Sequence, residues 1–279
     1  IFAHDGQLLY YALVQRDIAD RQLATKRQQQ LIDTLSSSNE ELTRFAFVCS
    51  HDLQEPLRMI RSFSNRLQQH LREPLEQDTK AKQYFGFVID GANRAQTLIQ
   101  DILEYSRIDQ STTTLQLIDM NKLLSVIRET ALAADNTIGQ SEITWDELPT
   151  ILGNRTQMLQ LFQNLVNNGL KYQAQDAIKP VVHLRAKCQD EHWLFEVADN
   201  GIGIQHEYCE TIFEVFHRLH SKHEYAGTGI GLSICKKIAH RHGGSIWVES
   251  NPGSGSTFFI RIPKSDQVPI QTVNFESVG

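Results

Sequence analysis

The sequence predicts an α-helical hairpin that forms a dimeric four-helix bundle with a second copy, followed by an α/β sandwich domain. Apolar or small side chains recur in steps of three and four over residues 42–71 and again over residues 85–102, which is the spacing of one stripe along each of two helices. After about residue 115, short alternating runs typical of strands are mixed with helical patterns. A chain of 279 residues is long enough for two such domains.

The first forty residues predict the end of another domain and a connecting helix. Residues 1–15 contain a run of strand formers after Gly6, and they resemble the last strand of a PAS sensor domain. Residues 16–40 are polar and favour a helix, so we expect a helical coiled-coil linker there. The resemblance implies an upstream sensor domain in a longer chain and leaves a membrane anchor upstream open. A disordered polar tail is the alternative.

The hairpin is predicted over residues 41–110, with a break between its helices at residues 72–76, which include Pro74. One hairpin cannot bury a stripe on both of its helices, whereas two hairpins can, and we therefore expect a homodimer. The stripes consist of the residues at positions 42, 46, 49, 53, 57, 60, 64, 67 and 71, and of Phe85, Val88, Ala92, Ala95, Ile99 and Ile102.

The α/β domain is predicted over residues 115–265, after a polar linker at residues 111–114 and before a loose tail at residues 266–279. Asn154 is placed to cap a helix that runs to about Tyr172, with the side chain of Gln157 bonding back to the cap. Strands are expected at residues 143–145, 181–186, 193–198, 246–250 and 257–262.

The composition of the chain bears on which partners the protein can have and on where in the cell it is expected. The net charge of -6 gives no reason to expect nucleic acid or an anionic membrane as a partner, and no apolar run is long enough for a membrane span. The four cysteines are dispersed and form no Cys-x-x-Cys pair. This pattern disfavours a zinc site or disulfides and favours a reducing, cytoplasmic location.

The α/β domain contains a pattern suited to phosphate. Residues 227–232 read Gly-Thr-Gly-Ile-Gly-Leu and open a predicted helix, whose free N–H groups and dipole favour an anion. Asn164, Asn168 and Lys171 are spaced to share one helix face. An amide oxygen suits Mg²⁺ and an ammonium suits phosphate. Taken singly, these residues could be ordinary turns and surface amides, and no βαβ unit surrounds the glycines as a Rossmann site would require.

The order of these motifs resembles the GHKL (Bergerat-type) ATP-binding fold of histidine kinases, gyrase, Hsp90 and MutL, over residues 115–263. The resemblance implies ATP and Mg²⁺ as cofactors, Asn168 as the Mg²⁺ ligand, Asp199 as acceptor of the adenine amino group, and a lid over residues 205–226. Gly169 stands where Ala is usual, and we expect it to cost only about 1 kcal/mol of helix propensity. The other nucleotide-binding residues implied are Asn164, Lys171, Tyr172, Gly201, Gly203, Arg218, Gly227, Thr228, Gly229, Ile230, Gly231 and Leu232.

A second motif lies in the first predicted helix. Residues 50–57 read Ser-His-Asp-Leu-Gln-Glu-Pro-Leu and resemble the phosphoacceptor box of histidine kinases, especially the phytochrome-like group. His51 is two residues from the stripe positions on each side, so it should point outward. A neutral imidazole is a competent nucleophile near pH 7, and Asp52 beside it can orient the ring and take up the proton. We therefore predict His51 and Asp52 as catalytic residues.

The resemblance implies a sensor histidine kinase of two-component systems. ATP would phosphorylate His51, and the phosphoryl group would pass to an Asp of a response regulator receiver domain. Glu55 occupies a position where Thr or Asn often accompanies phosphatase activity, so we expect little or none. A non-kinase GHKL ATPase and a pseudokinase scaffold are the alternatives. The signal, the cognate regulator and the choice between cis and trans transfer are not fixed by the sequence.

Overall fold

The computed structural model describes residues 21, 25–29, 53–71, 78–110, 115–134, 141–173, 179–219, 225 and 227–264. The chain divides into two units, residues 1–52 and 53–279. In the first unit the description is confined to Arg21 and residues 25–29, which are helical. The predicted PAS-like strand, most of the linker, His51 and Asp52, the hairpin break, residues 111–114 and the tail lie outside the described residues.

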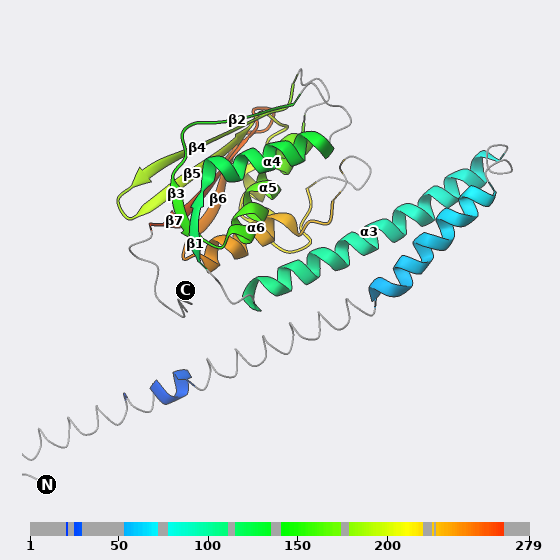
Figure 1. The fold of residues 1–279 in the computed structure, drawn as a ribbon, viewed down its shortest axis with the longest axis horizontal. Helices are drawn as coiled ribbons and strands as arrows, with labels where there is room; N and C mark the ends of the chain where they lie inside the picture. The colour runs from blue at the N-terminus through cyan, green and yellow to red at the C-terminus, as the bar shows by residue number, and fades with distance from the viewer. Residues whose placement is uncertain are drawn as a thin grey trace, which may run out of the picture. The chain divides into compact units, whose positions relative to one another are not determined.

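The predicted hairpin is represented by a helix over residues 53–70 and by α3 (Thr79–Gln110), as Figure 1 shows. Asp78 begins the second helix, because its side chain accepts hydrogen bonds from the N–H groups of Lys80 and Ala81 at 3.0 and 3.1 Å. Several residues of the predicted apolar stripe are exposed to solvent, since Leu53, Ile60 and Leu67 are each about half exposed. Among the described residues, no helix combines the length and apolarity needed to cross a bilayer.

The second domain is built from seven strands and three helices that follow α3 in the described part of the chain. In order these are β1 (Gln116–Asp119), α4 (Met120–Ala134), β2 (Glu142–Trp145), β3 (Thr150–Gly153), α5 (Arg155–Lys171), β4 (Val181–Gln189), β5 (His192–Asp199), α6 (Gly231–Arg241), β6 (Ser245–Ser250) and β7 (Ser256–Pro263). Two short 3₁₀ turns, His206–Tyr208 and Thr211–Phe213, lie between β5 and α6. The five predicted strands are confirmed, whereas β1, α4 and β3 were not predicted.

The sheet has the order β2-β4-β5-β7-β6, in which β2 and β4 are parallel and the other neighbours antiparallel. β1 and β3 form a separate antiparallel pair. The three helices cover one face of the sheet, which gives the predicted two-layer architecture (Figure 1). The core lies between the layers, where Phe162 of α5 meets Phe195 of β5 edge to face with ring centroids 5.3 Å apart.

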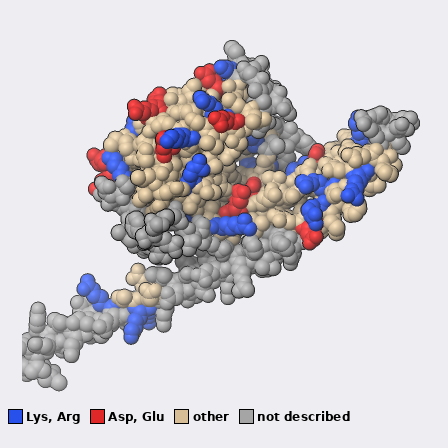
Figure 2. All heavy atoms as spheres, viewed as in Figure 1, with Lys and Arg blue, Asp and Glu red and all other residues tan. Residues whose placement is uncertain are grey.

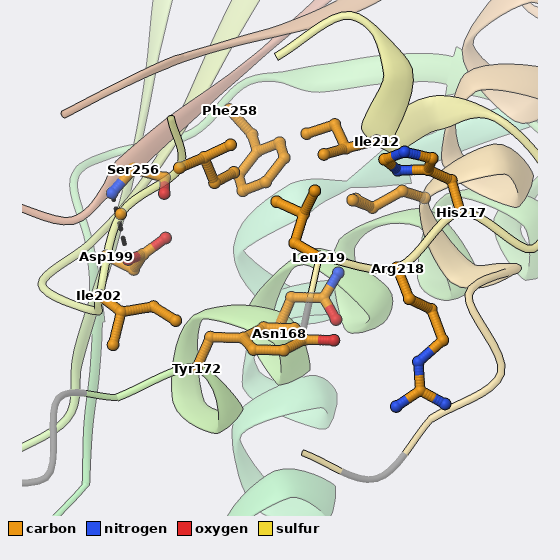
Figure 3. Close-up of a pocket in the computed structure, with 13 residues that line it drawn as sticks. Asn168, Tyr172, Asp199, Ile202, Ile212, His217, Arg218, Leu219, Ser256 and Phe258 are labelled. Atoms are coloured by element: carbon orange, nitrogen blue, oxygen red, sulfur yellow. Dashed lines mark hydrogen bonds between the residues drawn. The ribbon is translucent and has the colours of Figure 1, made fainter. Parts of the chain in front are cut away.

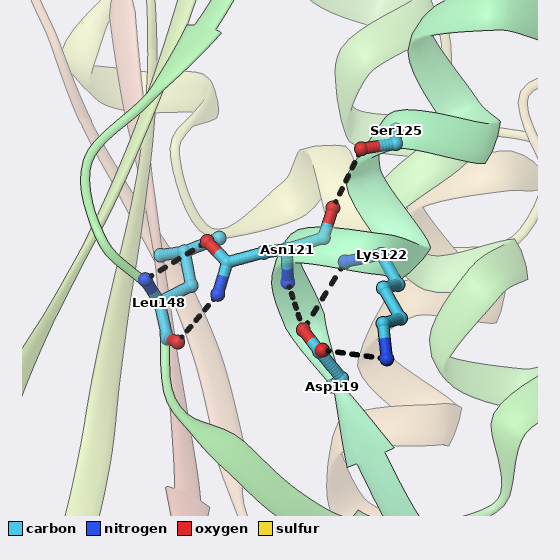
Figure 4. A network of polar contacts seen from close by, with 5 residues as sticks. All are labelled: Asp119, Asn121, Lys122, Ser125 and Leu148. Atoms are coloured by element: carbon cyan, nitrogen blue, oxygen red, sulfur yellow. Dashed lines mark hydrogen bonds and ion pairs between the residues drawn. The ribbon is translucent and has the colours of Figure 1, made fainter.

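A polar network fixes the start of α4 (Figure 4). Asp119 accepts hydrogen bonds from the N–H groups of Asn121 and Lys122 at 3.0 and 3.2 Å. The amide of Asn121 then pairs with the backbone of Leu148, donating to its carbonyl at 2.8 Å and accepting from its N–H at 3.2 Å. This exchange imitates strand pairing and ties the segment that precedes β3 to the start of α4.

The surface of the α/β domain carries mixed charge. Figure 2 shows acidic and basic side chains interspersed on the visible face of this domain.

On the far side of β4 and β5 from the helices, Glu196 is almost fully buried beneath ion pairs with Arg185 and Lys187. These cations hold the pKa of the Glu196 carboxyl below its usual value against the opposing effect of burial.

The approach of α5 to the sheet is limited by Gly169. A Cβ at this position would lie 2.7 Å from Cγ2 of Val182 and 3.1 Å from Cβ of Asp199. Val182 is fully buried on β4 and cannot turn away, because a β-branched side chain has few rotamers. The expectation that Gly169 matters only through helix propensity is therefore wrong: its missing side chain is what lets α5 lie against β4 and β5.

Gly169→Ala should destabilise the protein although alanine is the better helix former. Overpacking a core costs about 1–3 kcal/mol, which exceeds the gain of about 1 kcal/mol in helix propensity. Gly86→Ala in α3 is the matched control, because nothing lies within 4 Å of a Cβ there, and it should stabilise. Urea unfolding of both variants measures the difference, and stabilisation by both would contradict this account.

Candidate functional site

The candidate site is a cavity beside the C-terminal half of α5 (Figure 3), and the 590 Å³ of empty space within it includes solvent at its open mouth. Six of the predicted site residues line it: Asn168, Tyr172, Asp199, Gly203, Arg218 and Leu232. The other lining residues, which the sequence reasoning did not assign to the site, are Ile202, Ile204, Ile212, His217, Leu219, Ser256 and Phe258.

A carboxylate held by two backbone groups marks one end of the cavity. Oδ1 of Asp199 accepts hydrogen bonds from the N–H groups of Gly201 at 2.9 Å and Ser256 at 3.2 Å. Figure 3 shows the second oxygen directed into the cavity. Burial raises the pKa of Asp199, and these two hydrogen bonds oppose the rise. The Asp199 side chain therefore presents one fixed, unshared acceptor oxygen to a ligand.

The backbone after β5 runs close to its neighbours at two predicted glycines. A Cβ on Gly201 would lie 2.2 Å from the carbonyl oxygen of Tyr172. Gly203 has a φ of +71°, and a Cβ there would lie 2.1 Å from the carbonyl oxygen of Asn251. Both positions require glycine, so their predicted part in shaping the pocket has a steric basis.

The three polar residues predicted to share a face of α5 have different neighbours. The side-chain amide of Asn168 lines the cavity. Nδ2 of Asn164 donates to the carbonyl of Gly231 at 3.3 Å, which joins α5 to the start of α6. Nζ of Lys171 donates to the hydroxyl of Tyr172 at 3.0 Å. The face thus supplies an amide oxygen and an ammonium beside the glycine-rich segment.

That glycine-rich segment, residues 227–231, leads into α6 as predicted. Its Gly227 and Gly229 have φ values of +151° and +80°, which only glycine adopts readily. Ile230 is fully buried in the core, so its side chain anchors the segment. The hydroxyl of Thr228 donates a hydrogen bond to the carboxyl group of Asp101 in α3, a contact that was not predicted. Burial raises the pKa of Asp101, while this bond opposes the rise.

The described part of the predicted lid comprises residues 205–219 and Tyr225. Phe213 is buried and packs edge to face on Phe258, whereas Phe216 is 56% exposed with a φ of +66° and does not line the cavity. His217 lines the cavity, and its Nδ1 is buried without a hydrogen-bond partner among the described residues.

Arg218 joins two parts of the lid. It lines the cavity, and its guanidinium donates to the carbonyls of Tyr225, at 2.8 Å, and Gly227. Arg218 is one of the predicted nucleotide-binding residues, and these two hydrogen bonds hold its guanidinium at the edge of the cavity.

The last turns of α3 pack on the α/β domain. Glu104 accepts a hydrogen bond from Gln160 of α5 at 2.8 Å. Lys237 of α6 donates to the carbonyl of Tyr105 at 2.8 Å and lies 4.1 Å from the centre of its ring. Ile108 is buried in the core of the α/β domain. The helix that precedes the predicted linker is therefore held by this domain through polar and apolar contacts.

The N-terminus of α5 is capped as predicted, but only in part. Oδ1 of Asn154 accepts from the N–H of Gln157 at 3.0 Å. The reciprocal bond from Gln157 is not formed, because its side chain donates to the carbonyl of Ile108 at 3.3 Å. The N–H of Asn154 instead donates to Nε2 of His242 at 3.1 Å, and Nδ1 of His242 lies 2.9 Å from the carbonyl of Ile238. A buried, neutral imidazole thus fixes the start of the helix that carries the polar site residues.

Two family models match the chain in succession. The model described as "His Kinase A (phospho-acceptor) domain" matches residues 41–111, and the model described as "Histidine kinase-, DNA gyrase B-, and HSP90-like ATPase" matches residues 153–266. These ranges agree with the order of the hairpin and the α/β domain.

Curated relatives and solved structures point the same way. The chain is 42% identical over 234 residues to cyanobacterial phytochrome A of Nostoc sp. strain PCC 7120, covering 84% of this chain and 30% of that protein. It is 41% identical over 237 residues to phytochrome-like protein Cph1 of Synechocystis sp. strain PCC 6803, covering 84% and 31%. The chain thus spans less than a third of either relative. Full-length ShkA, solved in complex with AMPPNP, shares the fold with a TM-score of 0.59 at 24% identity, over 78% of this chain and 45% of that one.

Acid should weaken the cap formed by His242. Burial lowers the pKa of His242 below its ordinary value, so the folded protein resists a proton that the unfolded chain accepts below about pH 6.5. The stability contributed by the neutral ring is complete above that pH and is lost as the pH falls toward the lower pKa of the folded state. Each unit of pKa difference corresponds to about 1.4 kcal/mol.

Urea unfolding at several pH values between 7.5 and 5 tests this. His242→Gln should flatten the dependence of the unfolding free energy on pH in that window. His240→Gln is the control, because His240 lies exposed on the same helix and should leave the dependence as it is. An unchanged slope in His242→Gln would show that the ring does not carry the effect.

Proposed function

The chain belongs to the sensor histidine kinases of two-component systems, and from this premise we propose that it binds Mg-ATP in the cavity of its α/β domain and transfers the γ-phosphoryl group to His51. One observation carries the proposal. The cavity is lined by the fixed carboxylate of Asp199 and by the side chains of Asn168 and Arg218. The Lys171 ammonium and the glycine-rich start of α6 lie next to each other in the chain segments that lead into it. The carboxylate matches a base with an amino group, and the other groups match a chain of phosphates.

The end of the cavity at Asp199 would bind adenine. The unshared oxygen of Asp199 would accept a hydrogen bond from the exocyclic amino group, which guanine lacks at that position. Apolar side chains from three segments, Ile202, Ile212 and Phe258, line the space around it and suit the faces of a purine. The adenine is therefore selected by one hydrogen bond in an otherwise apolar pocket.

The other end would bind the phosphates. Asn168 offers an amide oxygen of the type that Mg²⁺ accepts, and the ion, when bound, neutralises phosphate charge. Arg218 and Lys171 add positive charge, and the free N–H groups at the start of α6 complete the site. Gly201 and Gly203 would shape the adenine end, and Tyr172 would flank the nucleotide. The remaining residues that we assign to nucleotide binding are Asn164, Gly227, Thr228, Gly229, Ile230, Gly231 and Leu232.

The reaction would be an in-line displacement. A ring nitrogen of neutral His51 forms a bond to the γ-phosphorus, the bond to the β–γ bridging oxygen breaks, and ADP leaves with the electron pair. Asp52 orients the ring and takes up its proton. An Asp of a response regulator receiver domain then accepts the phosphoryl group. Little phosphatase activity is expected because Glu55 takes the place of Thr or Asn, and the Glu55 side chain forms an exposed ion pair with Arg58 at 3.2 Å.

We also propose that the hairpin forms a homodimer. Leu53, Ile60 and Leu67 are 53%, 47% and 51% exposed along one helix, and Val88 of α3 is 50% exposed. These side chains occupy the stripe positions that a four-helix bundle would cover. The upstream sensor domain stays a proposal that rests on the resemblance of residues 1–15.

Transfer from ATP to His51 predicts a characteristic label. Incubation with γ-labelled ATP should give an acid-labile, base-stable product. His51→Gln should abolish the label while ATP binding persists. Asp199→Asn should abolish both, because the amide oxygen would stay with the N–H groups of Gly201 and Ser256 and the NH2 group, a donor, would face the amino group of adenine. Filter assays and equilibrium dialysis measure the two properties. Label that survives in His51→Gln would refute transfer to this residue.

Dimerisation through the stripe predicts that Ile60→Glu lowers the sedimentation mass of the full chain toward the monomer, because the charge would be buried between hairpins. Ser62→Glu is the control, since this exposed residue lies two positions away on another face of the helix. Equal behaviour of the two variants in analytical ultracentrifugation would exclude the stripe as the interface.

A further inference from the structure

Tyr225 lies in the described part of the lid and contacts the end of α5. Its ring packs against that of Tyr172, with centroids 5.0 Å apart. Its hydroxyl donates a hydrogen bond to the carbonyl of Gln173 at 2.7 Å. Its own carbonyl accepts from Arg218 at 2.8 Å. One ring contact and two hydrogen bonds, to the two residues that follow α5 and to Arg218 of the lid, therefore fix Tyr225 two residues before Gly227.

Tyr172 in turn holds the ammonium of Lys171. Nζ of Lys171 lies 4.3 Å from the centre of the Tyr172 ring and donates to its hydroxyl at 3.0 Å. The same Nζ would lie 2.8 Å from a Cβ at Gly227. The ammonium is thus held against the start of the glycine-rich segment through the ring that Tyr225 packs on.

A lysine held in this way should increase the affinity of the site for the phosphates of a nucleotide. A lysine side chain has several rotatable bonds, and a ligand that must order it loses binding free energy. A lysine that is already in place avoids this loss. The acceptor for adenine is held independently, because Asp199 is fixed by the N–H groups of Gly201 and Ser256.

We propose that Tyr225 is a positioning residue for the phosphate end of the nucleotide: by packing on Tyr172 and fastening the lid to the end of α5, it keeps Lys171 beside Gly227. The inference rests on the proposed binding of ATP in this cavity. Tyr225 therefore sets the affinity for the phosphates and leaves the affinity for adenosine nearly unchanged.

Binding of Mg-ADP and of adenosine to the full chain tests this by calorimetry. Tyr225→Ala should weaken ADP binding at least tenfold and adenosine binding less than twofold. Tyr225→Phe, which keeps the ring and loses the bond to Gln173, should show a smaller effect of the same kind. Tyr208→Phe is the control for this variant, because Tyr208 is a partly exposed lid tyrosine outside the cavity lining, and it should leave both affinities unchanged.

A double-mutant cycle with Lys171→Met identifies the route of the effect. If Tyr225 acts through Lys171, Tyr225→Ala should cost little further ADP affinity once the ammonium is gone. Equal losses for ADP and adenosine, or additive losses in the double variant, would overturn the role of Tyr225 and leave the proposed function standing. Failure of the wild type to bind ADP would overturn the proposed function itself and this inference with it. Tyr225→Phe keeps the test decisive if the alanine variant does not fold.

Discussion

The site depends on the close packing of α5 against β4 and β5. One side of this helix supplies core residues such as Phe162 and Leu165, and the adjacent side carries Asn164, Asn168 and Lys171. Gly169 lets the helix lie against Val182 and Asp199, so the same approach that closes the core brings the amide of Asn168 and the carboxylate of Asp199 to one cavity. Packing and ligand geometry are therefore set by one helix-to-sheet distance.

The glycine-rich segment belongs to two interfaces at once. Ile230 fixes it in the core, while Thr228 bonds to Asp101 near the end of α3. Lys237 of α6 and Gln160 of α5 donate hydrogen bonds to Tyr105 and Glu104, which lie in the next turn of α3. Because Thr228 is among the residues assigned to the phosphates, a change in this segment on binding a nucleotide also changes a contact with α3. The nucleotide site and the second helix of the hairpin thus share a hydrogen-bonded boundary.

Sequence periodicity predicted elements whose faces differ in polarity. Burial alternates over the first half of β4 and most of β7, because one face of the sheet packs on helices, and α5 has a cap and a continuous apolar side. β1 and β3 have four residues each and pair with one another outside the main sheet. Their alternation of apolar and polar residues is too short to be recognised in the sequence. The contacts of Tyr225 and Thr228 join parts of the chain that are distant in sequence, and periodicity predicts which face a residue lies on but not which residue lies opposite it. His51 and Asp52 lie outside the described residues, so their roles stay predictions.

The two ends of α5 are tied to different parts of the molecule, His242 at the start and Tyr225 beyond the end. Seventeen helical residues span about 25 Å, so the helix sets a fixed separation between these attachments. One inserted or deleted residue would rotate everything beyond it by about 100° and change that separation by about 1.5 Å. Asn168 and Lys171 would then turn away from Asp199 while the core lost its register. Natural variation in chain length among relatives should therefore avoid this helix and collect in the connections around it.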